Sequence, residues 1–124
     1  MISAKPVATW GHKTVAWDAA KAEARAILEI IARTGQLITY SELSRKVKVI
    51  TFQPDGHDFH GFLGQLSEES EIDSKGMISA LVVRMEDGRP GKGFFALGKE
   101  LGHDVSDPDV FWAGELKRVY RTFS

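Results

Sequence analysis

Basic side chains in two separate stretches are the residues most suited to chemistry in this sequence. One group lies before the middle of the chain, and the other surrounds a glycine-rich stretch. They are Arg45, Lys46, Lys48, Arg84, Arg89 and Lys92. Lys and Arg donate charge-assisted hydrogen bonds to phosphate oxygens, and such contacts position a protein on a nucleic-acid backbone. We therefore predict that these side chains flank one groove and bind nucleic acid, such as duplex DNA, with an affinity that falls steeply as salt rises.

An acidic stretch supports an alternative function. Residues 55–75 contain six carboxylates and a single Lys; they repel phosphate and offer only Gln65 for contacts with base edges. Two Gly within a helix, each about 1 kcal/mol less favourable than Ala, indicate close approach of another backbone or packing within the chain. The alternative is a protein-interaction module for a basic partner, such as an antitoxin, an immunity protein or an inhibitor that mimics DNA. Its surface would consist of Gly61, Gly64, Glu68, Glu69 and Glu71.

The remaining reactive side chains predict neither catalysis nor a metal site. The absence of Cys excludes thiol catalysis, cysteine-based zinc sites and disulfides. The other metal-ligand candidates are one cluster and two single histidines, namely Asp55, His57, Asp58 and His60, then His12 and His103. No further pair of ligands at a recognisable spacing completes the cluster. The glycine-rich stretch lacks the P-loop pattern, and no Ser lies in a nucleophile-elbow sequence. We expect a non-enzymatic protein without a cofactor or a metal ion.

Composition is typical of a small globular protein. The chain has 124 residues, 43% of them hydrophobic, and a net charge of −1 from 16 basic and 17 acidic residues. No apolar run approaches the roughly 20 residues of a membrane span, and the amino terminus lacks a signal-peptide pattern. We expect a cytoplasmic protein that does not bind membranes. The near-zero charge is a cancellation between the acidic stretch and the basic groups.

Apolar spacing in the first half predicts three helices. Residues 1–13 form an arm, and helical periodicity then extends from residue 14 to a stop at Gly35. A strand fragment at residues 37–40 leads into a short helix at about residues 40–47, because Thr39 and Glu42 have capping-box spacing. A third helix buries the stripe of Phe59, Phe62, Leu63 and Leu66.

The second half predicts a hairpin and a final helix. Residues 78–85 are β-branched and apolar, which is typical of a strand. A turn at residues 86–93 follows, and residues 94–97 form a return strand or the first turn of a short helix ending at Gly102. Asp107 and Pro108 begin the last helix. Its buried residues are predicted to be Val110, Phe111, Leu116, Val119, Tyr120 and Phe123. Trp112 lies off this stripe, so an alternative role for Trp112 is a contact in the interface of a homodimer.

This order of elements predicts an α+β fold: a small winged helix-turn-helix-like domain spanning residues 14–124, with three helices, a β-hairpin wing and a C-terminal helix. Part of the sequence resembles the winged-helix domain of alkylguanine-DNA alkyltransferases. Residues 35–43, GQLITYSEL, resemble the segment that enters the family's helix-turn-helix, and residues 63–66, LGQL, fall in its DNA-reading helix. Residues 78–83, ISALVV, fall at its proline-cysteine-histidine-arginine-valine-valine motif. Gly88 and residues 91–101 resemble its glycine-rich turn and following helix.

The resemblance implies a scaffold without the family's chemistry. Ser79 stands at the position of the reactive cysteine, Ala80 at that of the neighbouring histidine, and Gly61 near that of the arginine that props out the flipped base. Alkyl transfer requires an activated thiolate, so this activity is excluded. Residues 81–95 also resemble a segment of small bacterial proteins of unassigned activity. The leading interpretation is a regulatory or architectural nucleic-acid-binding protein.

Overall fold

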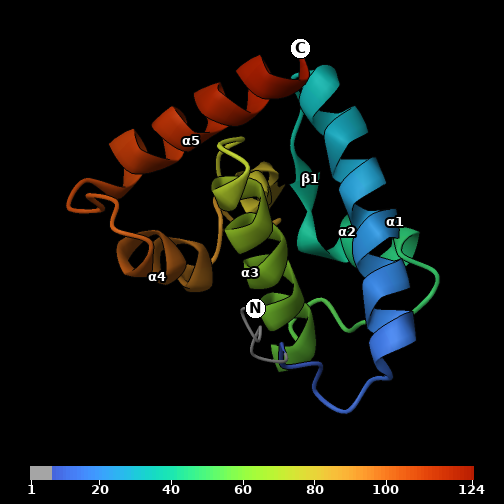
Figure 1. Cartoon of the computed structure of the whole chain (residues 1–124). Helices are drawn as coiled ribbons and strands as arrows, with labels where there is room; N and C mark the ends of the chain where they lie inside the picture. Colours follow the sequence, from blue (N-terminus) through green and yellow to red (C-terminus); the bar gives the residue numbers. More distant parts are fainter. Residues whose placement is uncertain (1–6) are drawn as a thin grey trace.

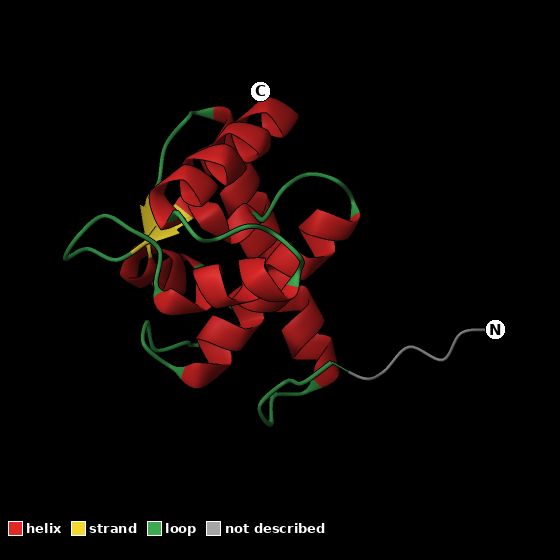
Figure 2. Ribbon diagram, turned by 90° about the vertical axis from the view of Figure 1, so that its left-hand side faces the viewer, coloured by secondary structure: helices red, strands yellow, loops and turns green. Residues whose placement is uncertain are grey.

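The computed structural model describes residues 7–124 and shows a mostly helical α+β domain with one small sheet (Figures 1 and 2). Helix α3 lies in the middle, with α1 on one side of it and α4 on the other, and α5 crosses one end (Figure 1). The elements are α1 (Thr14–Arg33), β1 (Ile38–Thr39), α2 (Tyr40–Lys46), α3 (His57–Ile72), the 3-10 helix η1 (Ile78–Leu81), β2 (Val82–Val83), α4 (Lys92–Glu100) and α5 (Pro108–Phe123). No helix in residues 7–124 is long and apolar enough to cross a membrane. Residues 1–6 of the predicted arm lie outside the described residues.

The main core forms where α1 meets α3. Helix α1 buries one stripe at helical spacing, with Trp17, Ala20, Ala24 and Leu28 fully buried. Helix α3 buries the predicted stripe, which consists of Phe59, Phe62, Leu63 and Leu66. The first and third predicted helices are therefore confirmed. The apolar stripes determine which way each helix faces, because burial of apolar surface is the main favourable contribution to folding.

Two predicted helix starts are confirmed by their caps. Thr39 Oγ1 accepts a hydrogen bond from Glu42 N (3.1 Å), which begins α2. Asp107 Oδ1 accepts one from Val110 N (3.2 Å), and Pro108 follows as the first residue of α5. Each cap satisfies a backbone N–H that has no partner within its helix.

The sheet pairs two distant segments in parallel. Ile38 lies opposite Val82 and Thr39 opposite Val83. The predicted strand at residues 78–85 is confirmed only at Val82–Val83, because residues 78–81 form η1 and residues 84–85 lie outside the strand. The reason is the side chains of two buried serines on α3. Ser67 Oγ accepts from Ser79 N (2.9 Å) and Ser70 Oγ accepts from Ile78 N (3.1 Å), so these backbone groups need no neighbouring strand.

The predicted β-hairpin wing is also wrong. Residues 84–91 form a turn and an irregular segment, and residues 94–97 lie within helix α4 rather than in a return strand. Phe94 and Gly98 face inward at helical spacing, while Lys92 and Gly93 are exposed. The i, i+4 spacing of the inward residues suits a helix and not a strand. The alternative expectation, a short helix from this segment, is confirmed.

A second core cluster joins α4 to α5. It is formed by Met77, Ala80, Phe94 and Phe111. Gly98 permits this contact, since a Cβ at that position would overlap the Phe111 ring. The prediction that α5 buries Val110 is wrong, because 68% of this residue is exposed. Of the other residues predicted to be buried, Phe111 and Val119 are buried, and Leu116, Tyr120 and Phe123 are half-buried.

Candidate nucleic-acid interface

The carboxyl end of α2 presents three exposed basic residues. Arg45 and Lys46 lie in its last turn, and Lys48 follows two residues later. The backbone at this point is held from α1, since Glu23 Oε1 accepts hydrogen bonds from Lys48 N (2.8 Å) and Val49 N (3.1 Å). These bonds satisfy N–H groups that would otherwise face only solvent, and they fix where the Lys48 side chain begins. Three positive charges therefore project from a tethered segment.

Two adjoining depressions connect this end of α2 with Arg84. The first has a volume of about 410 Å³ and is lined by Arg45 and Lys48. The second has a volume of about 200 Å³ and is lined by Arg84. Both are also lined by Ser41 and Pro54, so the two depressions adjoin; we refer to them together as the groove along α2. The structure thus places Arg45, Lys48 and Arg84 around these two depressions, although 36 or more residues separate Arg84 from the other two.

Two of the predicted phosphate-binding residues have carboxylate partners within the chain. Arg84 forms an ion pair with Asp87 across one turn. The hydrogen bond from the Arg84 guanidinium lowers the pKa of Asp87 and raises that of Arg84. Arg89 pairs with Asp109 and lies over the Trp112 ring, 5.9 Å from its centroid. A phosphate must compete with these carboxylates for either arginine.

The other four basic residues are exposed and form no ion pair in the part of the chain that the structure describes. They are Arg45, Lys46, Lys48 and Lys92. Lys46 and Lys92 line neither depression, but Lys46 adjoins Arg45 and Lys92 adjoins Gly91, which lines the second. Of the six predicted phosphate-binding residues, only Arg89 forms an ion pair with a residue of α5. Three of the six residues therefore line the two depressions, namely Arg45, Lys48 and Arg84.

Tyr40 anchors the segment that carries Lys92. Its hydroxyl accepts a hydrogen bond from Gly91 N (2.9 Å), and its ring lies 5.1 Å from the His60 ring, centroid to centroid. Burial raises the pKa of Tyr40, so the hydroxyl stays neutral at physiological pH and adds no negative charge to the groove. The carboxylates that line the second depression are Asp55 and Glu86.

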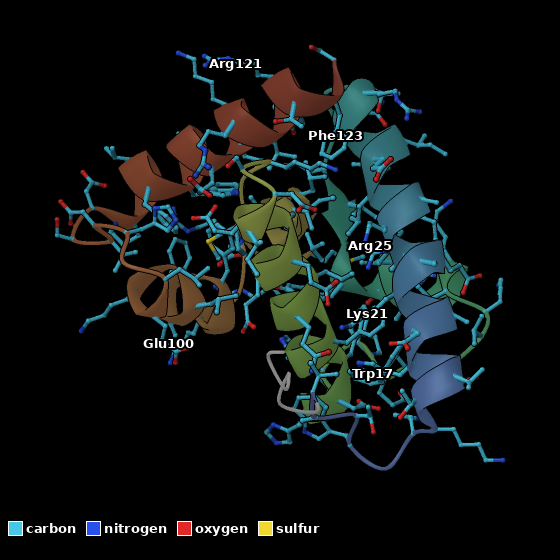
Figure 3. All side chains as sticks on the ribbon, viewed as in Figure 1. Trp17, Lys21, Arg25, Glu100, Arg121 and Phe123 are labelled. Carbon is cyan, nitrogen blue, oxygen red and sulfur yellow. The ribbon has the colours of Figure 1, made fainter. Side chains whose placement is uncertain are left out.

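Most of the alternative acidic surface is used inside the molecule. Glu69 accepts hydrogen bonds from Lys21 Nζ (2.7 Å) and Arg25 Nη2 (3.0 Å); both cations lie on the side of α1 that faces α3 (Figure 3). Glu71 pairs with His103 and Arg118. Glu68 alone is exposed, and it lines a depression of about 390 Å³ between α3 and α4 together with Gly61, Gly64 and Glu100.

The N-terminal arm accounts for Gly61, a contact that sequence reasoning missed. A Cβ at Gly61 would overlap the Trp10 indole. The arm is held on α3 by a hydrogen bond from Gln65 Nε2 to Ala8 O (2.7 Å) and by His12 Nε2, 2.9 Å from Asp58 Oδ2. The helical spacing of Gly61 indicated a close approach, but only the structure shows that the approaching group belongs to the same chain. The outer face of α3 is therefore partly covered.

Replacing Gly61 by Ala should displace Trp10 from α3 while the core stays folded. The new Cβ collides with an indole that is already 46% exposed, and Ala favours the helix by about 1 kcal/mol. We expect a red-shifted tryptophan emission and faster proteolysis near residue 10. Gly64→Ala is the matched control, because its Cβ would lie 3.9 Å from Leu97 Cδ2, an ordinary contact. Identical spectra and cleavage rates for the two variants would contradict the docking of the arm.

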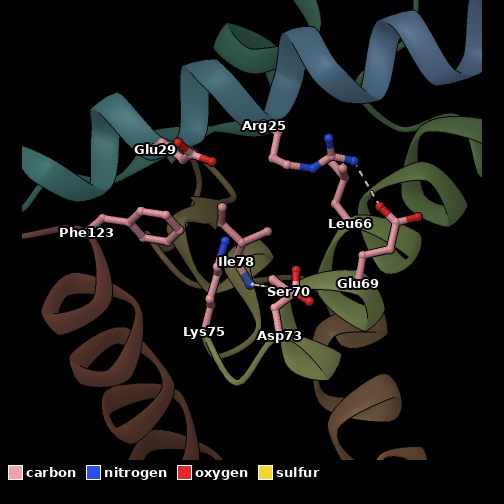
Figure 4. Close-up of a pocket in the computed structure, with 9 residues that line it drawn as sticks. All are labelled: Arg25, Glu29, Leu66, Glu69, Ser70, Asp73, Lys75, Ile78 and Phe123. Atoms are coloured by element: carbon pink, nitrogen blue, oxygen red, sulfur yellow. Dashed lines mark hydrogen bonds and ion pairs between the residues drawn. The ribbon is translucent and has the colours of Figure 1, made fainter.

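A separate cavity lies between α1, α3 and the end of α5 (Figure 4). It has a volume of about 250 Å³ and an apolar side formed by Leu66, Ile78 and Phe123. Its charged side chains are three carboxylates and two cations, namely Glu29, Glu69, Asp73, Arg25 and Lys75. Arg25 is paired with Glu69 (3.0 Å), and none of the six predicted phosphate-binding residues lines this cavity.

Trp112, for which the sequence also allowed a role in a homodimer interface, has contacts within its own chain. Its Nε1 donates to Ala80 O (2.9 Å), and its ring is half-buried beside the second core cluster. The off-stripe position is thus explained within one chain. Comparison with protein-family models, curated proteins and solved structures finds no match to this chain. The resemblance to alkylguanine-DNA alkyltransferases remains a prediction.

Proposed function

We propose that this chain is a non-enzymatic nucleic-acid-binding protein that contacts duplex phosphates through the end of α2, Arg84 and Lys92. The observation that carries this proposal is the pair of adjoining depressions, one lined by Arg45 and Lys48 and the other by Arg84. Basic side chains spread along a groove can follow a phosphodiester backbone, which carries one charge per phosphate. Such contacts position a protein without reading sequence, which suits a regulatory or architectural role.

The N-terminal arm covers one face of α3, which is a second reason to propose that nucleic acid is contacted through α2. Trp10 and Ala8 contact the side of α3 that a recognition helix turns toward base edges. Glu68 is exposed on that side and repels phosphate. The proposal therefore has α2, and not α3, approach the nucleic acid.

The position of Ser79 supports a function without covalent chemistry. Its Oγ lies 2.6 Å from Ser67 Oγ, and only 7% of the residue is exposed. A hydroxyl that is buried and hydrogen-bonded to another serine lacks the adjacent base that activates a nucleophile. Ser79 instead holds η1 on α3.

A basic protein partner is the second candidate. The depression between α3 and α4 has Glu68 and Glu100 on its edge and Gly64 and Leu97 on its floor. This surface is smaller than the one predicted from the sequence, because Glu69 and Glu71 are neutralised within the chain. Neutralising Glu68 and Glu100 together would remove this partner and leave binding to DNA intact.

The Asp87→Asn variant tests the nucleic-acid proposal. It removes the charge that competes for Arg84 and keeps an oxygen to accept from Arg89 N (3.1 Å). Exposed ion pairs are weak because water screens them, so we expect only roughly threefold tighter binding to a fluorescent duplex in an anisotropy titration at low salt. Asp18→Asn, which removes an exposed carboxylate on α1, is the control. Equal affinity of both variants for DNA would contradict the role of Arg84.

A further inference from the structure

Three potential metal ligands meet where α3, α5 and the segment between α4 and α5 come together. They are Glu71, His103 and Glu115, and one ligand atom of each lies within 4.8 Å of the others. Glu71 and His103 are in direct contact. Glu71 and His103 are 32 positions apart in the sequence, and Glu115 lies on the next helix, α5. This arrangement gives no ligand-spacing signal, so the sequence shows His103 only as a single histidine.

Neighbouring groups hold two of the three ligands, His103 and Glu115, in place. His103 N donates to Gly98 O (2.9 Å) at the end of α4, and the imidazole packs against Phe111, 5.3 Å between ring centroids. Glu115 Oε1 accepts from Met77 N (3.0 Å). The side chains of Glu71, His103 and Glu115 are 19%, 23% and 5% exposed. Hydrogen bonds that orient ligands in this way are typical of metal sites.

The charge at this cluster is balanced by one flexible side chain. Arg118 Nη1 lies 3.1 Å from Glu115 Oε2 and 3.4 Å from Glu71 Oε2. One guanidinium thus faces two carboxylates at the same point. Buried charges are paired or coordinate metals. Arg118 is 40% exposed at its side chain, so it can turn toward solvent and leave both carboxylates to a cation.

We propose that Glu71, His103 and Glu115 bind a divalent transition-metal ion of the zinc class when Arg118 turns away. An imidazole nitrogen with carboxylates suits Zn²⁺, whereas Mg²⁺ and Ca²⁺ prefer oxygen ligands alone. Metal–ligand bonds of about 2.0–2.2 Å place tetrahedral ligand atoms roughly 3.5 Å apart. Glu71 and His103, which are in direct contact, therefore have to separate, and the ligand atoms that lie up to 4.8 Å apart have to approach one another. Three protein ligands leave the fourth position to water.

Calorimetric titration of the full chain with zinc chloride tests this site. We expect one Zn²⁺ per chain and no binding of Mg²⁺ under the same conditions. His103→Gln, which keeps a hydrogen-bonding group beside Glu71, should lower the affinity for Zn²⁺ by about tenfold or more. His57→Gln removes an exposed histidine of α3 and should leave the affinity unchanged. Absence of zinc binding by the wild-type chain, or equal affinities of the two variants, would overturn the proposal.

The Arg118→Gln variant separates a metal site from an ordinary ion-pair network. In the presence of a chelator the variant should unfold at a lower temperature, because Glu115 loses its cation. Its affinity for Zn²⁺ should nevertheless rise about threefold or more, since the competing charge is gone. Arg118→Lys keeps the positive charge but loses the contact with both carboxylates, so it should bind Zn²⁺ with intermediate affinity. Circular dichroism first confirms that each variant is folded. Weaker zinc binding by both folded variants would overturn the proposal.

Discussion

Replacing Trp17 by Ala is expected to lower the free energy of unfolding by about 3–5 kcal/mol, the usual effect of removing a large buried aromatic side chain. Trp17 is completely buried. Its ring lies 5.2 Å from that of Phe62 and 6.0 Å from that of Phe52, and Nε1 donates to Gln65 Oε1 (2.8 Å). The substitution therefore leaves a cavity between α1 and α3 and an amide without its donor. Urea denaturation followed by circular dichroism measures the effect.

Trp10→Ala is the matched control for this prediction. Trp10 stacks on Trp17, with 5.7 Å between ring centroids, but is itself 46% exposed. Its removal exposes part of Trp17 and opens no internal cavity, so the expected loss is about 1 kcal/mol or less. Equal losses for the two variants would show that Trp17 is not the centre of this core.

Reversing the charges at the end of α2 should nearly abolish binding to duplex DNA. The triple variant Arg45→Glu, Lys46→Glu and Lys48→Glu replaces three exposed cations with groups that repel phosphate. Each lost phosphate contact removes close to one counterion, so three contacts correspond to about a thousandfold loss of affinity at low salt. The fold should persist, because the Glu23 hydrogen bonds reach the backbone and not these side chains. Anisotropy titrations of a labelled duplex measure the change.

A control variant with the same change in net charge distinguishes a local site from general repulsion. Lys99→Glu, Lys117→Glu and Arg121→Glu reverse three exposed cations on α4 and α5, away from α2 (Figures 1 and 3). The groove along α2 is untouched by these changes, so affinity should fall only about tenfold through the overall charge. Equal losses in the two triple variants would argue against the groove.

Local sequence signals were sufficient for the helices of the first half and for α5. Thr39 and Asp107 identified helix starts because a capping side chain acts within three residues. The buried stripe of α3 followed from its i, i+3, i+4, i+7 spacing. These signals need no knowledge of the rest of the chain.

The incorrect or missing predictions all depend on contacts between distant segments. The serines Ser67 and Ser70 take up the N–H groups of η1, so an apolar, β-branched stretch does not extend as a strand. The parallel pairing of Ile38 with Val82 joins segments that have no turn between them to signal it. The docking of Trp10 on Gly61, and the meeting of Glu71 with His103, likewise require the folded chain. The ion pairs of Arg84 with Asp87 and of Arg89 with Asp109 were not predicted either, and the binding role of the basic residues stays a prediction.

The salt dependence of binding to duplex DNA tests the central claim most directly. Arg45, Lys48 and Arg84 line the groove along α2, and Lys46 and Lys92 are exposed next to lining residues in the sequence. For about four to five phosphate contacts, a plot of log affinity against log salt concentration should be linear with a slope near −4, and the triple α2 variant should reduce the slope to about −1 to −2. A wild-type chain that shows no binding at about 50 µM protein in low salt, or a slope near zero, would contradict phosphate binding through this groove.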